Sequence, residues 1–153
     1  MDEKFMLEAY REAEKAYAQG EVPIGAVVVR QGQVIARGFN KKEGSKNPLL
    51  HGEMEAIYRA AQVLGRWRLS DCSLYVTLEP CSMCAGAIVN ARLARLVYAA
   101  PDKKRGCCGS SLDILSHPSS NYYPEVVAGV MASQCSQLLS DFFQELRSGR
   151  VKY

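Results

Sequence analysis

Apolar residues recur at helical spacing in three separate stretches of the chain. Over Glu3–Gln19 they fall three or four positions apart, with Asp2 as a candidate N-cap and Gly20 just past the end. The same spacing predicts a second helix over His51–Leu64. It also predicts a helix near the end of the chain, in which the buried residues are Cys135, Leu138, Leu139, Phe142, Phe143 and Leu146.

Shorter apolar runs between these helices predict strands. The runs IGAVVVR and QVIARGF flank Gln31-Gly32, so Ile24–Phe39 is expected to form a β-hairpin. The runs SLYVTL and LARLVYAA predict two more strands, separated by a helix over residues 81–91. The run EVVAGV predicts a last strand before the final helix.

Two segments rich in glycine, proline and polar residues predict loops. They are Asn40–Leu50 and Asp102–Pro124, the second with a short turn near Leu112–Leu115. Helices and strands otherwise alternate along the chain, without a repeat or a linker. This order predicts a single α/β domain over residues 1–153, with a central sheet covered by helices.

Composition narrows the class of protein only moderately. The 153 residues are 48% hydrophobic and 23% charged, as in an ordinary globular domain, and no apolar run approaches the roughly 20 residues that span a bilayer. The first residues, MDEKFMLEAYREAEK, are charged and amphipathic, unlike a secretory signal. We therefore expect a cytoplasmic protein without a membrane partner. In that compartment six cysteines favour free thiols or metal ligands over disulfides.

The net charge of +3 permits a nucleic-acid partner without requiring one. The positions of the basic residues say more than their number. Each cluster could be solvated surface, whereas several clusters on one rim could contact phosphates, and the sequence leaves both interpretations open. The clusters are Lys41, Lys42 and Lys46; Arg66 and Arg68; Lys103, Lys104 and Arg105; and Arg147, Arg150 and Lys152.

Cys81-x-x-Cys84 opens a predicted helix directly after a predicted strand. Such a pair could be a disulfide, a redox centre, a structural zinc site or half of a catalytic one. Because positions i and i+3 share a helix face, both sulfurs can reach one ion. His51, thirty residues upstream at another helix start, can supply a third ligand. Two thiolates and an imidazole suit Zn²⁺ and leave a fourth position for water, which is typical of catalytic zinc.

Glu53 is the candidate proton carrier of this site. Its position two residues after His51 puts it on a different helix face, poorly placed to bind the ion but able to touch the water. Two simpler interpretations stay open for these residues. His51 could have no special role at its helix start, and Glu53 could only complement the helix dipole.

The combination His-x-Glu and Pro-Cys-x-x-Cys resembles the zinc-dependent cytidine and nucleotide deaminase superfamily. The segments VPIGAVVV, GFN, LYVTLEPCSMCAGAIVNARL and LLSDFFQELR resemble its bacterial tRNA adenosine deaminase branch along nearly the whole chain. The resemblance implies a three-layer cytidine-deaminase-like domain, with a central mixed five-stranded sheet and helices on both faces. It also implies a homodimer, one zinc ion per subunit and a tRNA anticodon stem-loop as the substrate.

Within that resemblance, His51, Cys81 and Cys84 would bind zinc, and Glu53 would carry the proton. The activated water would attack C6 of the wobble adenosine, giving inosine and ammonia. Residues matching the family's substrate-binding positions are Asn40, Asp102, Lys104, Asn121, Phe143 and Arg147.

Some of these positions have a simpler explanation. Asn40 could make only local backbone bonds. Adjacent helical residues point to different faces, so one of Phe142 and Phe143 is expected to be core. The apolar stretch Ala85–Leu96 is more hydrophobic than a helix with one exposed face requires, which we take as support for a dimer.

The sequence departs from the family pattern at three places. Gly52 stands where alanine is common, Gln144 where arginine is common, and Cys107-Cys108 where small apolar residues are expected. We interpret the two cysteines as buried packing residues.

Two other functions remain open. One is a deaminase of a free base or nucleotide such as guanine or cytosine, and the other is a zinc-stabilised binding module without catalysis.

Overall fold

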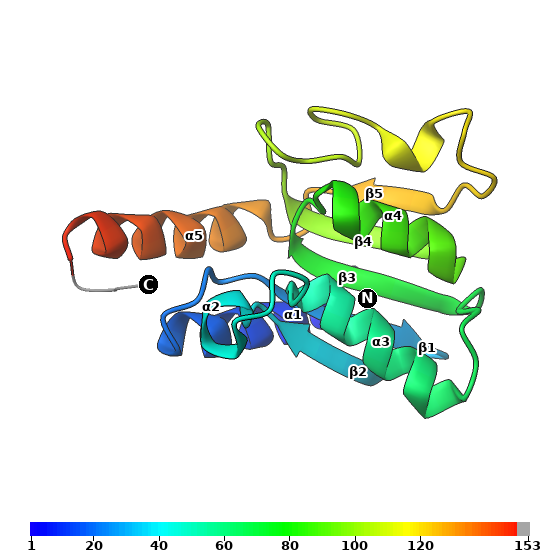
Figure 1. Cartoon of the computed structure of the whole chain (residues 1–153), viewed down its shortest axis with the longest axis horizontal. Helices are drawn as coiled ribbons and strands as arrows, with labels where there is room; N and C mark the ends of the chain where they lie inside the picture. Colours follow the sequence, from blue (N-terminus) through cyan, green and yellow to red (C-terminus); the bar gives the residue numbers. More distant parts are fainter. Residues whose placement is uncertain (150–153) are drawn as a thin grey trace.

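A computed structural model describes residues 1–149 and shows one mixed five-stranded sheet (Figure 1). The strand order is β2-β1-β3-β4-β5. β1 pairs antiparallel with β2 and with β3, whereas β3, β4 and β5 are parallel. The strands are β1 Gly25–Arg30, β2 Gln33–Phe39, β3 Cys72–Leu78, β4 Arg95–Ala100 and β5 Glu125–Ala128.

Helices cover both faces of this sheet, which confirms the predicted three-layer α/β arrangement. One layer holds α3 and α4, and the other holds α1 and α5, with α5 extending beyond the sheet (Figure 1). The helices are α1 Asp2–Ala18, α2 Lys42–Ser45, α3 Gly52–Leu64, α4 Ser82–Ala91 and α5 Ala132–Arg147, with a 3₁₀ turn, η1, at Ile114–Ser116. Arg150 and Lys152 of the last basic cluster lie outside the described residues.

Alternation along β1 explains the two hydrophobic cores. Ala26 and Val28 face the layer of α3 and α4, while Val27 and Val29 face the layer of α1 and α5. The hairpin turns at Gln31-Gly32, as predicted, because both residues adopt the positive φ of a tight two-residue turn.

The apolar stretch Ala85–Leu96 belongs to the core of a single chain. Ala85 and Ile88 of α4, Leu93 of the following turn and Leu96 of β4 are buried in the core cluster that also contains residues of β3. Burial within one chain therefore explains the hydrophobic character of this stretch, and that character does not support a dimer.

The prediction that Asn40–Leu50 is entirely loop is wrong, because α2 forms one turn within it. The carboxylate of Glu21 accepts hydrogen bonds from the N–H groups of Glu43 (3.0 Å) and Gly44 (2.6 Å). This buried glutamate satisfies N–H groups at the start of α2. Glu21 lies 22 residues before Glu43 in the sequence, so local composition does not reveal the helix.

Within residues 1–149, every helix is too short or too polar to span a lipid bilayer.

Asp2 anchors the start of α1 to the sheet. Its carboxylate accepts two hydrogen bonds from the Arg95 guanidinium, at 2.7 and 2.8 Å, and one from the Tyr75 hydroxyl at 2.7 Å. The Arg95 hydrogen bond is the main cause that lowers the pKa of Asp2 to about 2.

We therefore expect Asp2→Asn to destabilise the fold at neutral pH by about 1–2 kcal/mol, allowing for solvent screening. A depressed pKa contributes stability above its unfolded value near 3.9 and loses it as pH falls toward 2. Urea unfolding of both proteins checks this. The difference between them should be full at pH 7 and shrink below pH 4. A difference independent of pH would contradict the assignment.

Candidate active site

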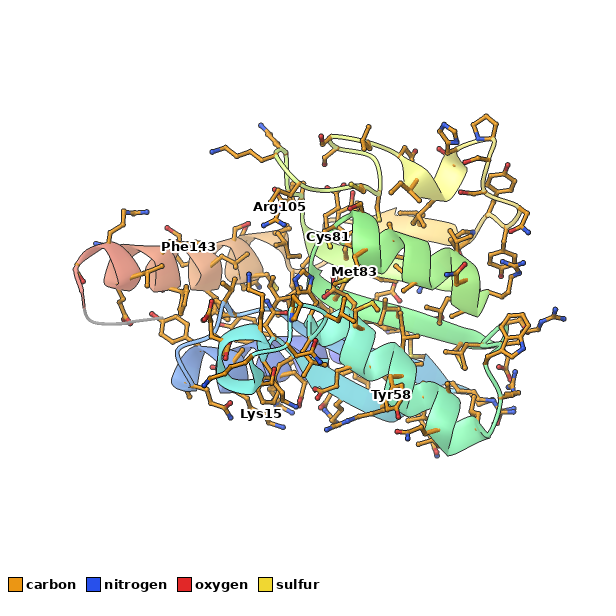
Figure 2. All side chains as sticks on the ribbon, viewed as in Figure 1. Lys15, Tyr58, Cys81, Met83, Arg105 and Phe143 are labelled. Carbon is orange, nitrogen blue, oxygen red and sulfur yellow. The ribbon has the colours of Figure 1, made fainter. Side chains whose placement is uncertain are left out.

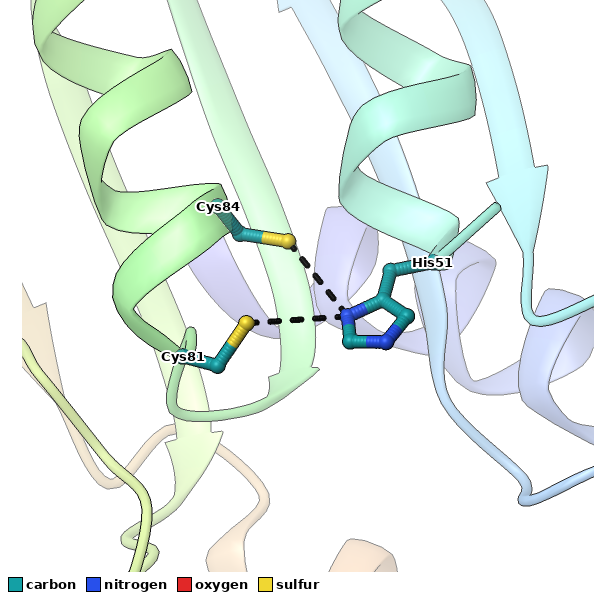
Figure 3. Close-up of side chains that lie close together, drawn as sticks. All are labelled: His51, Cys81 and Cys84. Atoms are coloured by element: carbon teal, nitrogen blue, oxygen red, sulfur yellow. Dashed lines mark hydrogen bonds between the residues drawn. The ribbon is translucent and has the colours of Figure 1, made fainter. Parts of the chain in front are cut away.

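Two helix starts on the same face of the sheet bring the predicted metal ligands together. His51 is the N-cap of α3 and Cys81 is the N-cap of α4, both with extended backbone, and Cys84 lies in the first turn of α4. All three side chains point into the space between the two helices (Figure 3).

The distances within this cluster suit a zinc ion. His51 Nδ1 lies 3.6 Å from the Cys81 sulfur and 3.7 Å from the Cys84 sulfur, and all three ligand atoms lie within 4.8 Å of one another. Tetrahedral zinc with ordinary bond lengths separates a nitrogen and a sulfur ligand by about 3.6 Å. The donor atoms and their spacing therefore fit zinc, as the sequence predicted.

The two cysteines of the cluster have pKa values shifted in opposite directions. The Cys84 thiol, and then His51, lower the pKa of Cys81 to about 3, which favours a thiolate. The same hydrogen bond to Cys81 and burial raise the pKa of Cys84, and the Cys81 sulfur raises the pKa of His51. The N-termini of α3 and α4 add partial positive charge that stabilises thiolates.

Glu53 lies beside this cluster, buried in the first turn of α3. Only 3% of it is exposed, and its Oε1 is the buried side-chain oxygen that lacks a hydrogen-bond partner within residues 1–149. Burial raises the pKa of Glu53, while the charge of His51 opposes that rise. A glutamate that only complements the dipole of its helix can do so from the surface, so that simpler interpretation does not explain why Glu53 is buried. An unpaired buried carboxylate oxygen is costly and points to a functional role.

A cleft of about 440 Å³ opens in front of His51. Its charged lining consists of four cationic residues, Lys42, Lys103, Lys104 and Arg105, and three acidic ones, Glu21, Glu43 and Asp102. The carboxylates of Glu21 and Asp102 accept hydrogen bonds from backbone N–H groups. The apolar part of the lining includes Leu78, Leu139 and Phe143.

Asn40 lines this cleft at the end of β2 and is buried. Its amide oxygen accepts a hydrogen bond from the Gly52 N–H at 2.9 Å. This bond ties β2 to the first residue of α3, so Asn40 does have the simpler backbone role. A contact with a base would fall to its amide nitrogen and stays a prediction.

Asp102 and Lys104 also line the cleft. The Asp102 carboxylate accepts the N–H groups of Lys104 (3.2 Å) and Arg105 (3.1 Å), which shapes the turn after β4. Lys104 is exposed and can reach a ligand. Asp102 therefore orients the backbone that carries the cations.

The two adjacent phenylalanines on α5 divide as expected. Phe142 is fully buried, with its ring centroid 5.5 Å from that of Tyr17, whereas Phe143 is 38% exposed and lines the cleft. Figure 2 shows Phe143 projecting from α5, with Arg105 on the loop after β4. Arg147 and Gln144 are exposed on α5 but do not line this cleft.

Asn121 lies away from the other candidates. Its neighbour Tyr122 packs under the Arg92 guanidinium, 5.7 Å away, at the C-terminal end of α4. The ligands lie at the N-terminal end of α4, about 15 Å along the helix axis. The structure thus does not bring Asn121 to the cleft, and its contact with substrate stays a prediction.

The departures from the family pattern have structural explanations in two of three cases. A Cβ at Gly52 would lie 3.1 Å from the Phe39 Cα, so β2 lies closer to α3 here than an alanine would allow without a shift of a few tenths of an ångström. Cys107 and Cys108 are both buried in the core, as interpreted from the sequence. Nothing in the structure explains Gln144.

Glu79 is a buried residue of this region that the sequence analysis missed. Its carboxylate bonds to the loop that follows β4. An acidic residue at the end of a buried strand, directly before Pro80-Cys81, is the signal that could have identified it.

Comparisons with known proteins agree with this geometry. The sequence matches the MafB19-like deaminase family over residues 1–147. It is 49% identical over 146 residues to the tRNA-specific adenosine deaminase of Bacillus subtilis (strain 168), covering 95% of this chain and 91% of that protein.

Two solved structures of related deaminases differ in their similarity to this chain. A tRNA:A34 deaminase studied for A-to-I editing at the wobble position has a TM-score of 0.86 and 42% identity, covering 88% of this chain and 98% of that one. This match confirms the cytidine-deaminase-like fold. A guanine deaminase from Bacillus subtilis is more distant, with a TM-score of 0.64 and 33% identity over 95% of this chain and 93% of that one. The chain therefore belongs to the MafB19-like deaminase family and, within it, to the tRNA-specific adenosine deaminases.

Proposed function

We propose that this protein hydrolytically deaminates the wobble adenosine of a tRNA anticodon to inosine, releasing ammonia. One observation carries the chemistry. Three zinc-type ligand atoms from two helix starts lie beside a buried carboxylate with an unpaired oxygen, next to a cleft whose lining includes the exposed cations Lys103, Lys104 and Arg105. The family relationship supplies the substrate class.

His51, Cys81 and Cys84 would hold the metal, with one zinc ion per subunit. When bound, zinc supplies Lewis acidity that makes a water molecule a better nucleophile toward C6 of adenine. Glu53 accepts the proton of that water on its carboxylate and delivers it to N1 of the ring. It then takes the proton of the new C6 hydroxyl and gives it to the departing amine. The C6 carbonyl forms as the C–N bond breaks, so that adenosine and water become inosine and ammonia.

Several features of the cleft support an RNA substrate over a free base. Lys103, Lys104 and Arg105 offer charge for phosphates, and the exposed ring of Phe143 offers a surface on which a base can stack. A free purine carries no phosphate and would not need these cations. An unpaired anticodon loop presents both groups together.

The decisive assay offers the purified protein an anticodon stem-loop with a wobble adenosine, beside free adenosine, guanine and cytosine. We expect inosine only in the stem-loop, and no product from a stem-loop with a wobble guanosine. Conversion of only the free bases would overturn the RNA assignment. Guanine is the important competitor, because a guanine deaminase is among the related structures.

We also propose that the protein works in the cytoplasm as a homodimer, on the strength of the family relationship. Light scattering at micromolar concentration should give twice the chain mass of 16.9 kDa. A mass of one chain would contradict the dimer without affecting the proposed reaction. Elemental analysis should find one zinc ion per chain, and its absence would remove the metal from the proposal.

A further inference from the structure

The carboxylate of Glu79 accepts four hydrogen bonds from the loop that follows β4. One carboxylate oxygen accepts the Asp102 N–H (3.1 Å) and the Ser110 hydroxyl. The other accepts the N–H groups of Cys108 (3.1 Å) and Ser110 (3.0 Å). Glu79 is only 2% exposed, and these four donors are neutral. A buried carboxylate held in this way fixes both ends of the segment 102–110.

The backbone of this loop packs directly against the Glu79 carboxylate. A Cβ at Gly106 would lie 2.4 Å from the Glu79 Cδ, so the loop backbone touches the carboxylate directly. The Cys107 N–H also donates to the Pro80 carbonyl oxygen at 2.9 Å. Glu79 and Pro80 are the two residues that precede the zinc ligand Cys81. The loop is therefore attached to the same turn that presents the metal site.

The segment held by Glu79 carries the cations of the cleft. Lys103, Lys104 and Arg105 lie between its first and last anchored residues, and all three are exposed and line the cleft. Their side chains are long and flexible, so the backbone position sets where their charges can reach. A loop released from Glu79 would keep the charges but spread them over many positions.

We propose that Glu79 is a positioning residue that holds the Lys103–Arg105 cations in register with the metal site, so that they bind RNA phosphates next to the reacting base. This inference rests on the proposed RNA substrate. Glu79 does not line the cleft and is not one of the three clustered ligand residues. Its loss therefore weakens binding of the stem-loop more than it slows the chemical step.

Glu79→Gln tests the proposal, because glutamine keeps the volume but turns two acceptor sites into donors that face backbone N–H groups. We expect the KM for the stem-loop to rise about tenfold and kcat to change less than about threefold, with zinc content unchanged. The dependence of log KM on log salt concentration should weaken by about 0.7 for each phosphate that the released loop no longer neutralises. Amide exchange at Asp102, Cys108 and Ser110 should accelerate, while that of α1 is unchanged.

Two further variants keep the test decisive. Ser110→Ala removes the hydroxyl that donates to Glu79, and it should raise the KM for the stem-loop less than Glu79→Gln does. This variant tests the same contact if Glu79→Gln does not fold. Glu12→Gln, at a buried glutamate on α1 across the sheet, should leave KM and the salt dependence unchanged.

Three results would overturn the inference. One is faster loop exchange with unchanged KM and salt dependence, and another is unchanged exchange at the three amides. The third is a loss of kcat alone. If the wild-type protein does not convert the stem-loop at all, the proposed function fails instead, and the exchange measurement still reports whether Glu79 holds the loop.

Discussion

Replacing Glu53 by glutamine is expected to lower kcat for the wobble adenosine by about 10²–10⁴-fold, the usual contribution of a general acid–base group. Glutamine has nearly the same shape but cannot carry a proton between water and the base. Because Glu53 is not expected to bind the metal, zinc content should stay at one per chain. The melting temperature should not fall, since the change removes a buried carboxylate with an unpaired oxygen.

The matched control is again Glu12→Gln, a buried glutamate that bonds to Lys15 on the surface of α1. Its kcat should equal that of the wild type. Single-turnover measurement of inosine formation, combined with elemental analysis, separates the possible results. Loss of activity together with zinc would place Glu53 in the metal shell. Retained activity would remove Glu53 from the reaction. A binding module would be favoured only if the wild-type protein also bound the stem-loop without forming inosine, and if Glu53→Gln left that binding unchanged.

Replacing Gly38 by alanine is expected to destabilise the protein by about 1–3 kcal/mol and to disturb the metal site, through overpacking. The added Cβ would lie 2.3 Å from the Gly52 carbonyl oxygen and 2.8 Å from the Ala56 nitrogen. Both atoms belong to the backbone of α3, which cannot yield by rotating a side chain. The helix must shift away from β2, and His51 at its N-cap must shift with it.

Urea unfolding and zinc affinity measure the two effects of this substitution. Gly86→Ala is the control within another helix, because no heavy atom lies within 4 Å of its added Cβ. That change should stabilise the protein by about 0.5–1 kcal/mol, as expected for alanine in a helix. Equal unfolding midpoints for Gly38→Ala and the wild type would show that α3 can retreat without cost. Lower stability with unchanged zinc affinity would show that the metal site does not depend on this contact.

The sequence predicts features set by local spacing, and it misses those set by contacts between distant segments. Helical periodicity, the Gln31-Gly32 turn and the spacing of Cys81 and Cys84 are all local, and the structure has each of them. The short helix α2 depends on the carboxylate of Glu21, which lies on the far side of the whole hairpin. No window of residues 40–50 contains that information.

Buried glutamates account for much of what sequence reasoning could not supply at the candidate site. Glu79 looks like any acidic residue at a strand end until the fold places three backbone N–H groups around it.

The family resemblance assigns Asn121 to substrate binding, but Asn121 precedes β5 and therefore lies at the end of the sheet opposite the cleft. The direction of the strands explains both results. Because β3, β4 and β5 are parallel, Glu79 and the loop after β4 lie at one end of the sheet and Asn121 lies at the other. The pattern of apolar residues does not specify strand direction.

The pairing of the strands has a consequence for how such a protein can change over evolution. β1 begins where β2, β3, β4 and β5 all end, so the chain segments that line the cleft emerge together at one rim of the sheet. The turns at the opposite rim, including Gln31-Gly32 and the Asn121 segment, lie outside that lining as far as residues 1–149 show it. Lengthening a connection at the first rim changes the lining of the cleft, whereas lengthening one at the second leaves that lining unchanged. Selection for new substrates and selection for durability can therefore act on separate sets of loops.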